Sequence, residues 1–434
     1  MKLFISRMFT LYGSNIKDDF YSTANKEYLE NCEIKPGRLI SGLTYDLSDT
    51  VMEQTEDIIN EVLSSPHEKG TPEQKIADLY ETVMDMDGRN KAGYEPLKPY
   101  IDLIDSAENI DDLISMQSVL KEETGTYSFM DFFLSVDFTD STKTNLFFSI
   151  STPDMDKAFY SNTDENTKQL YFDFITDRLA LLGDKSNVTA EEIFEFDKQL
   201  ADKQLSPEAQ SDVDQINNAF TFDEIAALFP NVDMEKVLSA TGLKKEDKII
   251  IPDVEITKEY AKLFNDSNID VLKAKAKLEL FNDFCGYLSQ DFIDLMNQFN
   301  SDFYGIDGSY TIEEMANLAV QNNLSQYVGK IYAEKYFSPE AKADVTKMVE
   351  DIIAVYKDRI KNLDWMSDET KEQALKKLDT MGIKVGYPDT WKSIVDDVEI
   401  KSVEEGGSYF SNKIALLKAS KDNMVANQGK PMAV

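Results

Sequence analysis

Few residues in this 434-residue sequence could carry out chemistry, and the single histidine limits them most. His67 lies in the polar segment Ser-Ser-Pro-His-Glu-Lys-Gly. A His-Glu-x-x-His zinc motif needs two imidazoles one helical turn apart, so this sequence cannot contain one. A Ser-His-Asp triad would depend on the same residue, and nothing around it supports one. We therefore interpret His67 as an exposed loop histidine and predict neither catalytic nor metal-ligating residues.

The two cysteines, Cys32 and Cys285, are too few for a disulfide framework. They also lie too far apart in the sequence for a zinc site of the usual Cys/His type. Cys285 falls on an apolar helical face between Phe284 and Leu288, which favours a buried free thiol. A bridge between the two cysteines stays open as the alternative.

Two acidic stretches have part of the spacing of a calcium loop. The first, residues 85–90, has Arg89 where calcium needs a carboxylate, and the second, residues 307–314, has Phe303 at the first loop position. We interpret each stretch as a turn followed by the start of a helix. Neither a glycine-rich phosphate loop nor a Walker lysine occurs in the sequence.

The composition is that of a folded acidic protein, with 42% hydrophobic residues and a formal net charge of -35. This charge repels phosphate backbones and anionic lipid, so we expect no nucleic-acid or membrane partner. No apolar run reaches the ~18 residues that a membrane span needs. Arg7 interrupts the apolar run at the start of the sequence, so residues 1–12 do not read as a secretory signal, and we expect a cytoplasmic protein.

Helical periodicity dominates the chain, so the expected fold is a mainly α, multi-helix lobe with a small β-hairpin. The hairpin is expected over residues 133–138 and 146–151, and a further strand over 248–254. One long central helix is expected over 269–299. The other expected helices cover residues 51–62, 71–86, 167–205 (two helices), 221–229, 232–238, 338–363 and 409–417.

Two of these predictions concern burial near the end of the chain. The helix over 338–363, capped by Ser338, is expected to bury one side, formed by Val345, Met348, Val349, Ile352, Tyr356 and Ile360. A further helix is expected after Ser367, because its hydroxyl can cap the first turn. We expect Gly382 to end that helix in a left-handed conformation and a buried corner to follow it, up to Pro388.

The same stretch resembles a known family. Trp365-Met366, Thr370-Lys371, Ala374, Lys377-Leu378 and Gly386-Tyr387-Pro388-Asp389 resemble the signature in the non-catalytic half of the neprilysin family. That family includes neprilysin, the endothelin-converting enzymes and bacterial oligopeptidase O. The resemblance runs from about residue 18 to residue 431 and includes Pro153, Asp154, Asp156 and Tyr160 after the hairpin. Ala24 and Tyr28 depart from the family's usual Val and Trp.

The resemblance implies two mainly helical lobes around a cavity, with zinc held in the lobe that this sequence lacks. It implies that this chain is the N-terminal region of a zinc metalloendopeptidase, walls the substrate cavity and is inactive alone, as a truncated product or one half of a split enzyme. Residues 1–70 would pack on the catalytic lobe, residues 71–400 would form the cavity wall, and residues 401–434 would begin the linker. The implied partners are peptides and a C-terminal catalytic half or separate catalytic chain. The alternatives are a stand-alone peptide-binding module and a nonfunctional remnant.

Arg38 is the one candidate substrate-binding residue. Members of the family carry an arginine in this early region that can pair with the terminal carboxylate of a peptide. A gap-free match places that arginine at Ile40, two positions away, so Arg38 serves only if the loop shifts. The alternative is an ordinary surface arginine.

Overall fold

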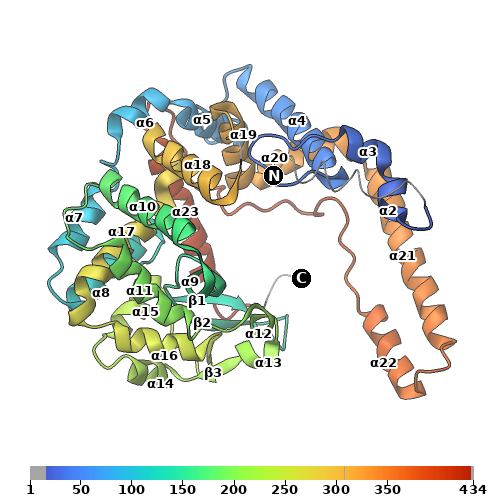
Figure 1. Ribbon diagram of the computed structural model, residues 1–434. Helices are drawn as coiled ribbons and strands as arrows, with labels where there is room; N and C mark the ends of the chain where they lie inside the picture. The colour runs from blue at the N-terminus through green and yellow to red at the C-terminus, as the bar shows by residue number, and fades with distance from the viewer. Residues whose placement is uncertain (1–15, 307, 432–434) are drawn as a thin grey trace.

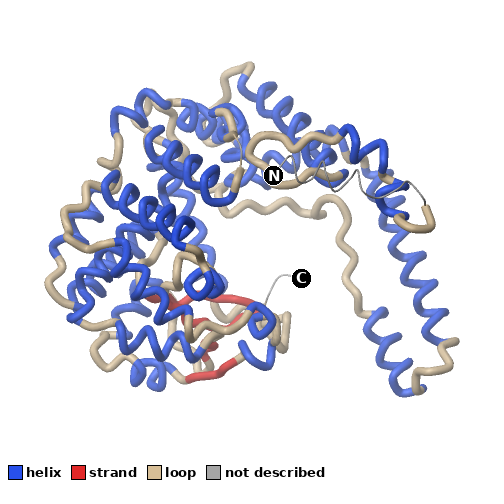
Figure 2. The backbone as a smooth tube through the Cα atoms, viewed as in Figure 1, coloured by secondary structure: helices blue, strands red, loops and turns tan. Residues whose placement is uncertain are grey.

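The computed structural model describes residues 16–306 and 308–431, and helices make up most of it (Figure 2). The predicted class, a mainly helical lobe with a small β-hairpin, is confirmed. The interpretation of residues 1–12 falls outside the described residues. The α-helices are α2 (Phe20–Ala24), α3 (Lys26–Asn31), α4 (Leu43–Leu63), α5 (Pro72–Met84), α6 (Met86–Ala92), α7 (Lys98–Ser106), α8 (Ile110–Thr124), α9 (Lys157–Asn162), α10 (Glu165–Leu181), α11 (Ala190–Ala201), α12 (Pro207–Gln210), α13 (Val213–Ile216), α14 (Phe222–Leu228), α15 (Met234–Thr241), α16 (Val254–Leu263), α17 (Ile269–Phe284), α18 (Gln290–Tyr304), α19 (Ile312–Asn323), α20 (Ser325–Tyr336), α21 (Pro339–Lys361), α22 (Asp368–Asp379) and α23 (Tyr409–Asn427).

One small sheet accompanies the helices, in the order β1-β2-β4-β3. The predicted hairpin is confirmed as β1 (Met130–Val136) and β2 (Thr144–Ile150), which pair antiparallel with Val136 opposite Thr144. The predicted strand near residue 250 is β4 (Ile249–Ile251), which runs parallel to β2, whereas β3 (Asn218–Phe220) had no signal in the sequence. Alternate hairpin residues such as Phe132 and Phe148 face the helical core, which is why this face of the sheet is apolar.

Side-chain caps explain where many of the helices begin. Thr71, Thr189, Thr311, Ser338 and Ser367 each accept a hydrogen bond from a backbone N–H in the first turn of the helix that follows. These caps satisfy donors that have no partner within the helix. The helix starts predicted near residue 71 and after Ser338 and Ser367 are therefore confirmed.

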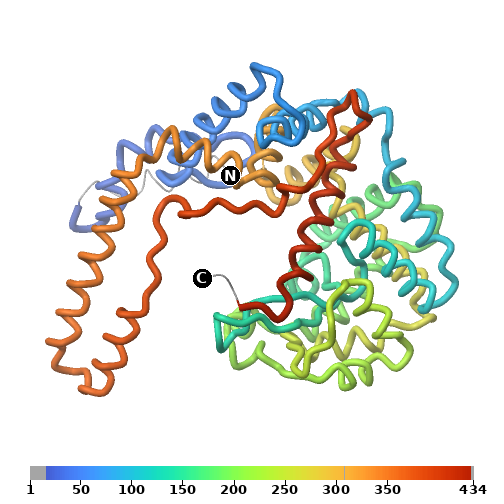
Figure 3. Tube along the Cα trace, turned by 180° about the vertical axis from the view of Figure 1, so that it is seen from behind, coloured from blue at the N-terminus to red at the C-terminus, as the bar shows by residue number. Residues whose placement is uncertain are grey.

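The core consists of two clusters of buried apolar side chains that one helix joins. The larger cluster holds the sheet, helices α7 to α11 and helices α14 to α18, and the smaller holds α4, α5, α19, α20 and the segment around Ile400. Helix α23 contributes Tyr409 and Leu416 to the smaller cluster and packs Ile414 and Leu417 against the larger one. Figure 3 shows α23, in dark red, running between the two groups of helices. The predicted boundaries at residues 70 and 400 stay predictions, although α4 and α23 both pack on helices between them.

The prediction of one continuous helix over 269–299 is wrong. Helix α17 ends at Phe284, a single 3-10 turn, η2 (Cys285–Tyr287), follows, and α18 starts at Gln290. Side chains from α6 hold this break open, because Arg89 donates to the carbonyls of Gly286 and Leu288, and the Asn90 side chain accepts from the first N–H of α18 at 2.8 Å. Apolar periodicity continues through the break, so the sequence pattern did not reveal it.

The prediction that α21 buries one side is also wrong. No residue of α21 is fully buried, and Met348, Ile352 and Tyr356 are each more than half exposed. Together with Val355 and Trp365 they form an uncovered apolar face on the α21–α22 hairpin, which projects away from the rest of the molecule (Figure 1). The periodicity predicted the helix correctly, but of the predicted side only Val345, Val349 and Ile360 are half-buried, whereas Met348, Ile352 and Tyr356 are exposed.

The end of α22 differs from the prediction as well. The helix stops at Asp379, and Gly382 does not adopt the left-handed conformation. The segment after it is largely exposed up to Gly386, so the predicted buried corner is wrong. Gly386 is the left-handed residue, and a Cβ there would lie 2.4 Å from the Phe337 ring, so only glycine fits this contact.

The base of the hairpin is held where residues 386–391 return to the body. Lys342 donates to the carbonyl of Tyr387 and to the carboxylate of Asp389, both at 2.8 Å. The Trp391 ring stacks on Tyr387 and contacts Gly329 of α20. The two helices are therefore fixed at one end only. Among the described residues, no helix combines the length and the apolar character needed to cross a bilayer.

We predict that the exposed face of α21 contributes little to the stability of this chain. Ile352→Ser changes the unfolding free energy by less than about 0.5 kcal/mol, because the side chain is already in water. Ile59→Ala, at a fully buried position of α4, serves as the control and costs about 2–5 kcal/mol. Urea denaturation of both variants measures the difference, and equal losses would contradict an uncovered face.

Candidate functional site

Arg38 lines a cavity of about 390 Å³ between α4 and the start of α19. Residues 35–38 form one side of the cavity, α4 supplies Asp49 and Glu53, and Tyr310 and Glu314 come from the start of α19. Gly308 allows this closure, because its left-handed backbone lies against Pro36 and a Cβ there would be 2.6 Å from the proline ring. The sequence therefore brings two distant loops together around Arg38.

The Arg38 guanidinium is already engaged. It forms an ion pair with Asp49 and lies over the Tyr45 ring at 5.4 Å, and only 14% of its side chain is exposed. The second oxygen of Asp49 accepts from Lys35 at 2.8 Å. Hydrogen bonds from Arg38 and then Lys35 hold the pKa of the Asp49 carboxyl below its ordinary value.

The charge around the cavity is unfavourable for a second carboxylate. Two cations in the lining stand against four carboxylates, namely Lys35 and Arg38 against Asp49, Glu53, Glu56 and Glu314. A peptide carboxylate would have to share Arg38 with Asp49 and approach these glutamates. The substrate-binding role of Arg38 stays a prediction.

The residues considered for metal chemistry lie apart from one another. His67 is in the loop between α4 and α5, as predicted, but its ring is half-buried and its Nε2 lies 2.6 Å from the Val62 carbonyl oxygen. Residues 16–306 and 308–431 hold no group of three His, Cys, Asp or Glu side chains able to hold a metal ion. The His, Cys, Asp and Glu side chains of this part of the chain therefore do not form a site that fits a zinc ion. The absence of bound zinc from this chain stays a prediction.

The cysteines and the acidic loops have structural explanations. Cys32 is exposed and Cys285 is half-buried, and both are free thiols. Burial raises the pKa of the Cys285 thiol to about 11, so it stays protonated at neutral pH. Asp85 caps α6 and Thr311 caps α19, which confirms a helix start at each calcium-like stretch, although Asp307 lies outside the described residues.

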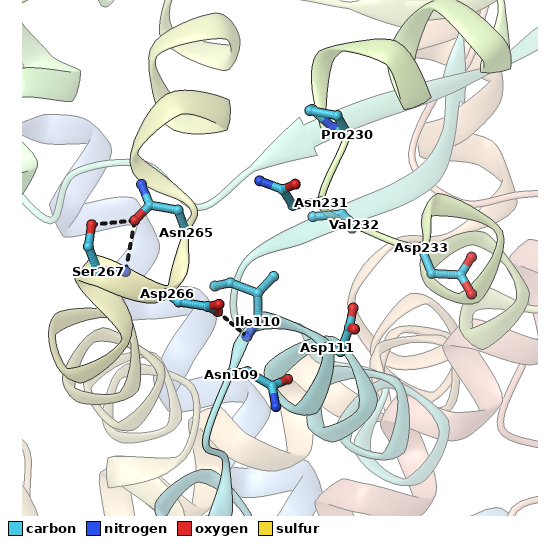
Figure 4. Close-up of a pocket in the computed structure, with 10 residues that line it drawn as sticks. All are labelled: Asn109, Ile110, Asp111, Pro230, Asn231, Val232, Asp233, Asn265, Asp266 and Ser267. Carbon is cyan, nitrogen blue, oxygen red and sulfur yellow. Dashed lines mark hydrogen bonds between the residues drawn. The ribbon is translucent and has the colours of Figure 1, made fainter.

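Another cavity, of about 870 Å³, lies where three helices begin (Figure 4). Several of its polar side chains already have partners: Asn109 caps α8, Asp233 caps α15, and Asp266 accepts from the Ile110 N–H at 2.9 Å. Asn265 accepts from the N–H of Ser267 in the same way. The shape of this cavity therefore follows from helix capping, and nothing in it converges on a reacting group.

A network of buried charges joins α10, α11, α17 and the segment that follows the β1–β2 hairpin. Arg178 of α10 donates to Asp154 at 2.9 Å, and Lys275 of α17 donates to Asp197 of α11 at 2.5 Å. The Tyr160 hydroxyl donates to Asp197 at 3.3 Å. Lys275 and Asp197 are almost completely excluded from solvent, so no substrate reaches them and the network is structural.

Two of the residues that carry the family resemblance, Asp154 and Tyr160, belong to this buried network. The cations of the network, Arg178 and Lys275, carried no visible signal, because a charged residue within an acidic helical sequence usually faces solvent. Their helical positions among apolar residues, such as Lys275 between Ala274 and Ala276, were the only available hint.

Comparison with solved structures shows the fold. PepO from Lactobacillus rhamnosis superposes with a TM-score of 0.84 at 22% identity, covering 96% of this chain and 67% of PepO. The zinc metalloprotease Zmp1 of Mycobacterium tuberculosis, in a complex with an inhibitor, has the same TM-score at 23% identity, covering 96% of this chain and 64% of Zmp1.

Sequence comparison shows the family. The neutral endopeptidase of Lactobacillus helveticus is 27% identical over 403 residues, which is 88% of this chain and 60% of that protein. The chain therefore spans about 60–67% of the length of these three proteins. The sequence model of peptidase family M13 matches residues 16–388. The chain belongs to this family, the neprilysin family of zinc metalloendopeptidases, as the resemblance predicted.

We predict that stability falls as the pH rises from about 4.5 to 7, because of Glu279. This carboxyl lies beside the buried network and accepts from Ser151 at 2.8 Å. Burial raises its pKa to about 7, although the Lys275 ammonium opposes the shift. The folded chain therefore holds a proton that the unfolded chain loses near its ordinary value of 4.5.

The substitution Glu279→Gln removes this proton linkage. Unfolding free energies measured in urea at pH 4.5 and pH 7 should differ less in the variant than in the wild type, by up to about 3 kcal/mol. Glu191→Gln, at an exposed position on α11, is the control and should keep the wild-type slope. An unchanged slope in Glu279→Gln would contradict the assignment.

Proposed function

We propose that this chain forms the non-catalytic region of a neprilysin-like zinc metalloendopeptidase. In this role it walls the peptide cavity, limits which substrates enter, and depends on another region or chain for the zinc ion. The observation that carries the proposal is family membership over residues 16–388 in a sequence with a single histidine. A zincin site needs two histidines on one helix, and His67 is in a loop.

The exposed apolar side chains of the α21–α22 hairpin support the proposed dependence of this chain on another region or chain. Met348, Ile352, Val355 and Tyr356 are 53–57% exposed, and Trp365 is 78% exposed. Contiguous apolar side chains on a surface mark a site of association rather than a solvated exterior. We propose that the zinc-binding region of the peptidase covers this face.

We expect the purified chain, supplied with zinc, to leave a broad library of unstructured peptides uncleaved. The sequence offers no pair of imidazoles to hold the metal, so no metal-bound water is activated. Mass spectrometry of the library before and after incubation, with and without a chelator, measures cleavage. Chelator-sensitive products at zinc-dependent rates would overturn the proposal.

We also propose that Arg38 pairs with the terminal carboxylate of a bound peptide. The guanidinium has donors beyond the one it gives to Asp49, and it lines a cavity large enough for a C-terminal residue. The role requires that peptides reach this cavity in the complete peptidase.

Peptides with free and amidated C-termini test this role by titration calorimetry. The wild-type chain should bind the free carboxylate more tightly, by up to about tenfold, and Arg38→Met should remove the preference. Lys26→Met, on the exposed surface of α3, should retain it. An equal preference in the wild type and Arg38→Met would assign Arg38 a purely structural role in holding the loop to α4.

A further inference from the structure

A third cavity, of about 460 Å³, lies where α6, η2, α19 and α23 meet. Arg89, Tyr287, Tyr409 and Lys413 line it. It opens to solvent beside Gly286 and Asn322, which are both exposed. Nothing in the sequence pattern or in the proposed function accounts for this cavity.

Arg89 brings a buried positive charge to the cavity without a carboxylate partner. Its guanidinium donates to the backbone carbonyls of Val83, Gly286 and Leu288 at 2.8–2.9 Å, and the residue is 6% exposed. Carbonyl oxygens satisfy donors, but they do not neutralise the charge. Burial accordingly lowers the pKa of Arg89 below its ordinary value.

Lys413, which is half-buried, brings a second positive charge from α23. Its ammonium donates to the Asn323 side-chain oxygen at 3.1 Å and lies 5.4 Å from the centre of the Tyr287 ring. No ion pair to Lys413 or Arg89 is found among the residues that the structure describes. Burial lowers the pKa of Lys413 as well, and no carboxylate offsets the effect.

Four of the other buried cations are ion-paired, whereas the fifth, Lys75, is 3% exposed and donates to the backbone carbonyls of Val395 and Asp396. Carboxylates lie within 2.9 Å of the charged groups of Lys121, Arg178, Lys275 and Lys277. The sequence has 80 acidic residues and 45 lysines and arginines, so carboxylate partners are abundant. This one cavity therefore holds two cations that have no ion-paired carboxylate. Such an arrangement is costly, because a buried charge is unfavourable without an opposite charge.

Two tyrosines complete the lining between the cations. The rings of Tyr287 and Tyr409 contact each other with centroids 4.6 Å apart, and the Arg89 guanidinium lies 5.4 Å from the centre of the Tyr409 ring. Phenol hydroxyls donate hydrogen bonds to oxyanions, and burial raises the pKa of both tyrosines, so they keep their protons at neutral pH.

We propose that this cavity binds a small oxyanion, carrying carboxylate or phosphate groups, between Arg89, Lys413 and the tyrosine pair. The bound anion supplies the missing negative charge and links α23 to η2 and α19. It thereby ties the helix that joins the two core clusters to the break between α17 and α18. The site is separate from the Arg38 cavity and does not depend on the proposed peptidase role.

Titration calorimetry and thermal unfolding of the whole chain test the site with two probes, inorganic phosphate and citrate, each against sodium chloride of equal ionic strength. Binding of either probe, with a rise in Tm beyond that in chloride, supports the site. Preference for phosphate identifies a phosphoryl ligand, and preference for citrate identifies a carboxylate ligand. Absence of specific binding by both probes overturns the proposal.

Substitutions locate the binding. Lys413→Gln keeps a donor for Asn323 but removes the charge, and should weaken binding about tenfold. Asn322→Asp puts a carboxylate at the exposed mouth of the cavity and should weaken binding similarly without disturbing the core. Lys418→Gln removes the same charge from an exposed position of α23 and should bind as the wild type does. Equal affinities in Lys413→Gln and Lys418→Gln would place the anion elsewhere and overturn the assignment.

Discussion

The buried ion pair between Lys275 and Asp197 is the constraint on which the larger core depends. A buried ammonium and a buried carboxylate are stable only when they remain next to each other. The pair therefore fixes the position of α17 along α11. The neighbouring pair of Arg178 and Asp154 fixes α10 against the segment after the hairpin in the same way. Apolar packing alone would allow these helices to slide, whereas charge pairing does not.

The rest of the architecture follows from which apolar surfaces find a partner. The sheet, helices α7 to α11 and helices α14 to α18 close one core, α4, α5, α19 and α20 close another, and α23 is shared by both. The α21–α22 hairpin belongs to neither core. Its exposed apolar side chains, such as Met348 and Ile352, therefore pack in neither core.

Local signals in the sequence were sufficient for most elements but not for their environment. Capping residues such as Thr189 and Ser367 marked helix starts correctly, because a cap acts over three residues. The break at Gly286 was missed, because Arg89 and Asn90, almost 200 residues earlier in the sequence, hold it open. The exposure of Ile352 was missed because periodicity reports an apolar side and not what covers it. For the candidate site, the sequence singled out Arg38 but could not show that Asp49 already occupies it.

Because the α21–α22 hairpin is attached at one end only, a small rotation at its base displaces its far end by a larger distance. Helix α21 has 23 residues, so at a rise of about 1.5 Å per residue it extends about 35 Å from its base. A rotation of about 10° at the contact between Gly386 and Phe337 then displaces the far tip by about 6 Å, with each helix still straight. The distance of the turn between α21 and α22 from its attachment thus amplifies any rotation at the base of the hairpin.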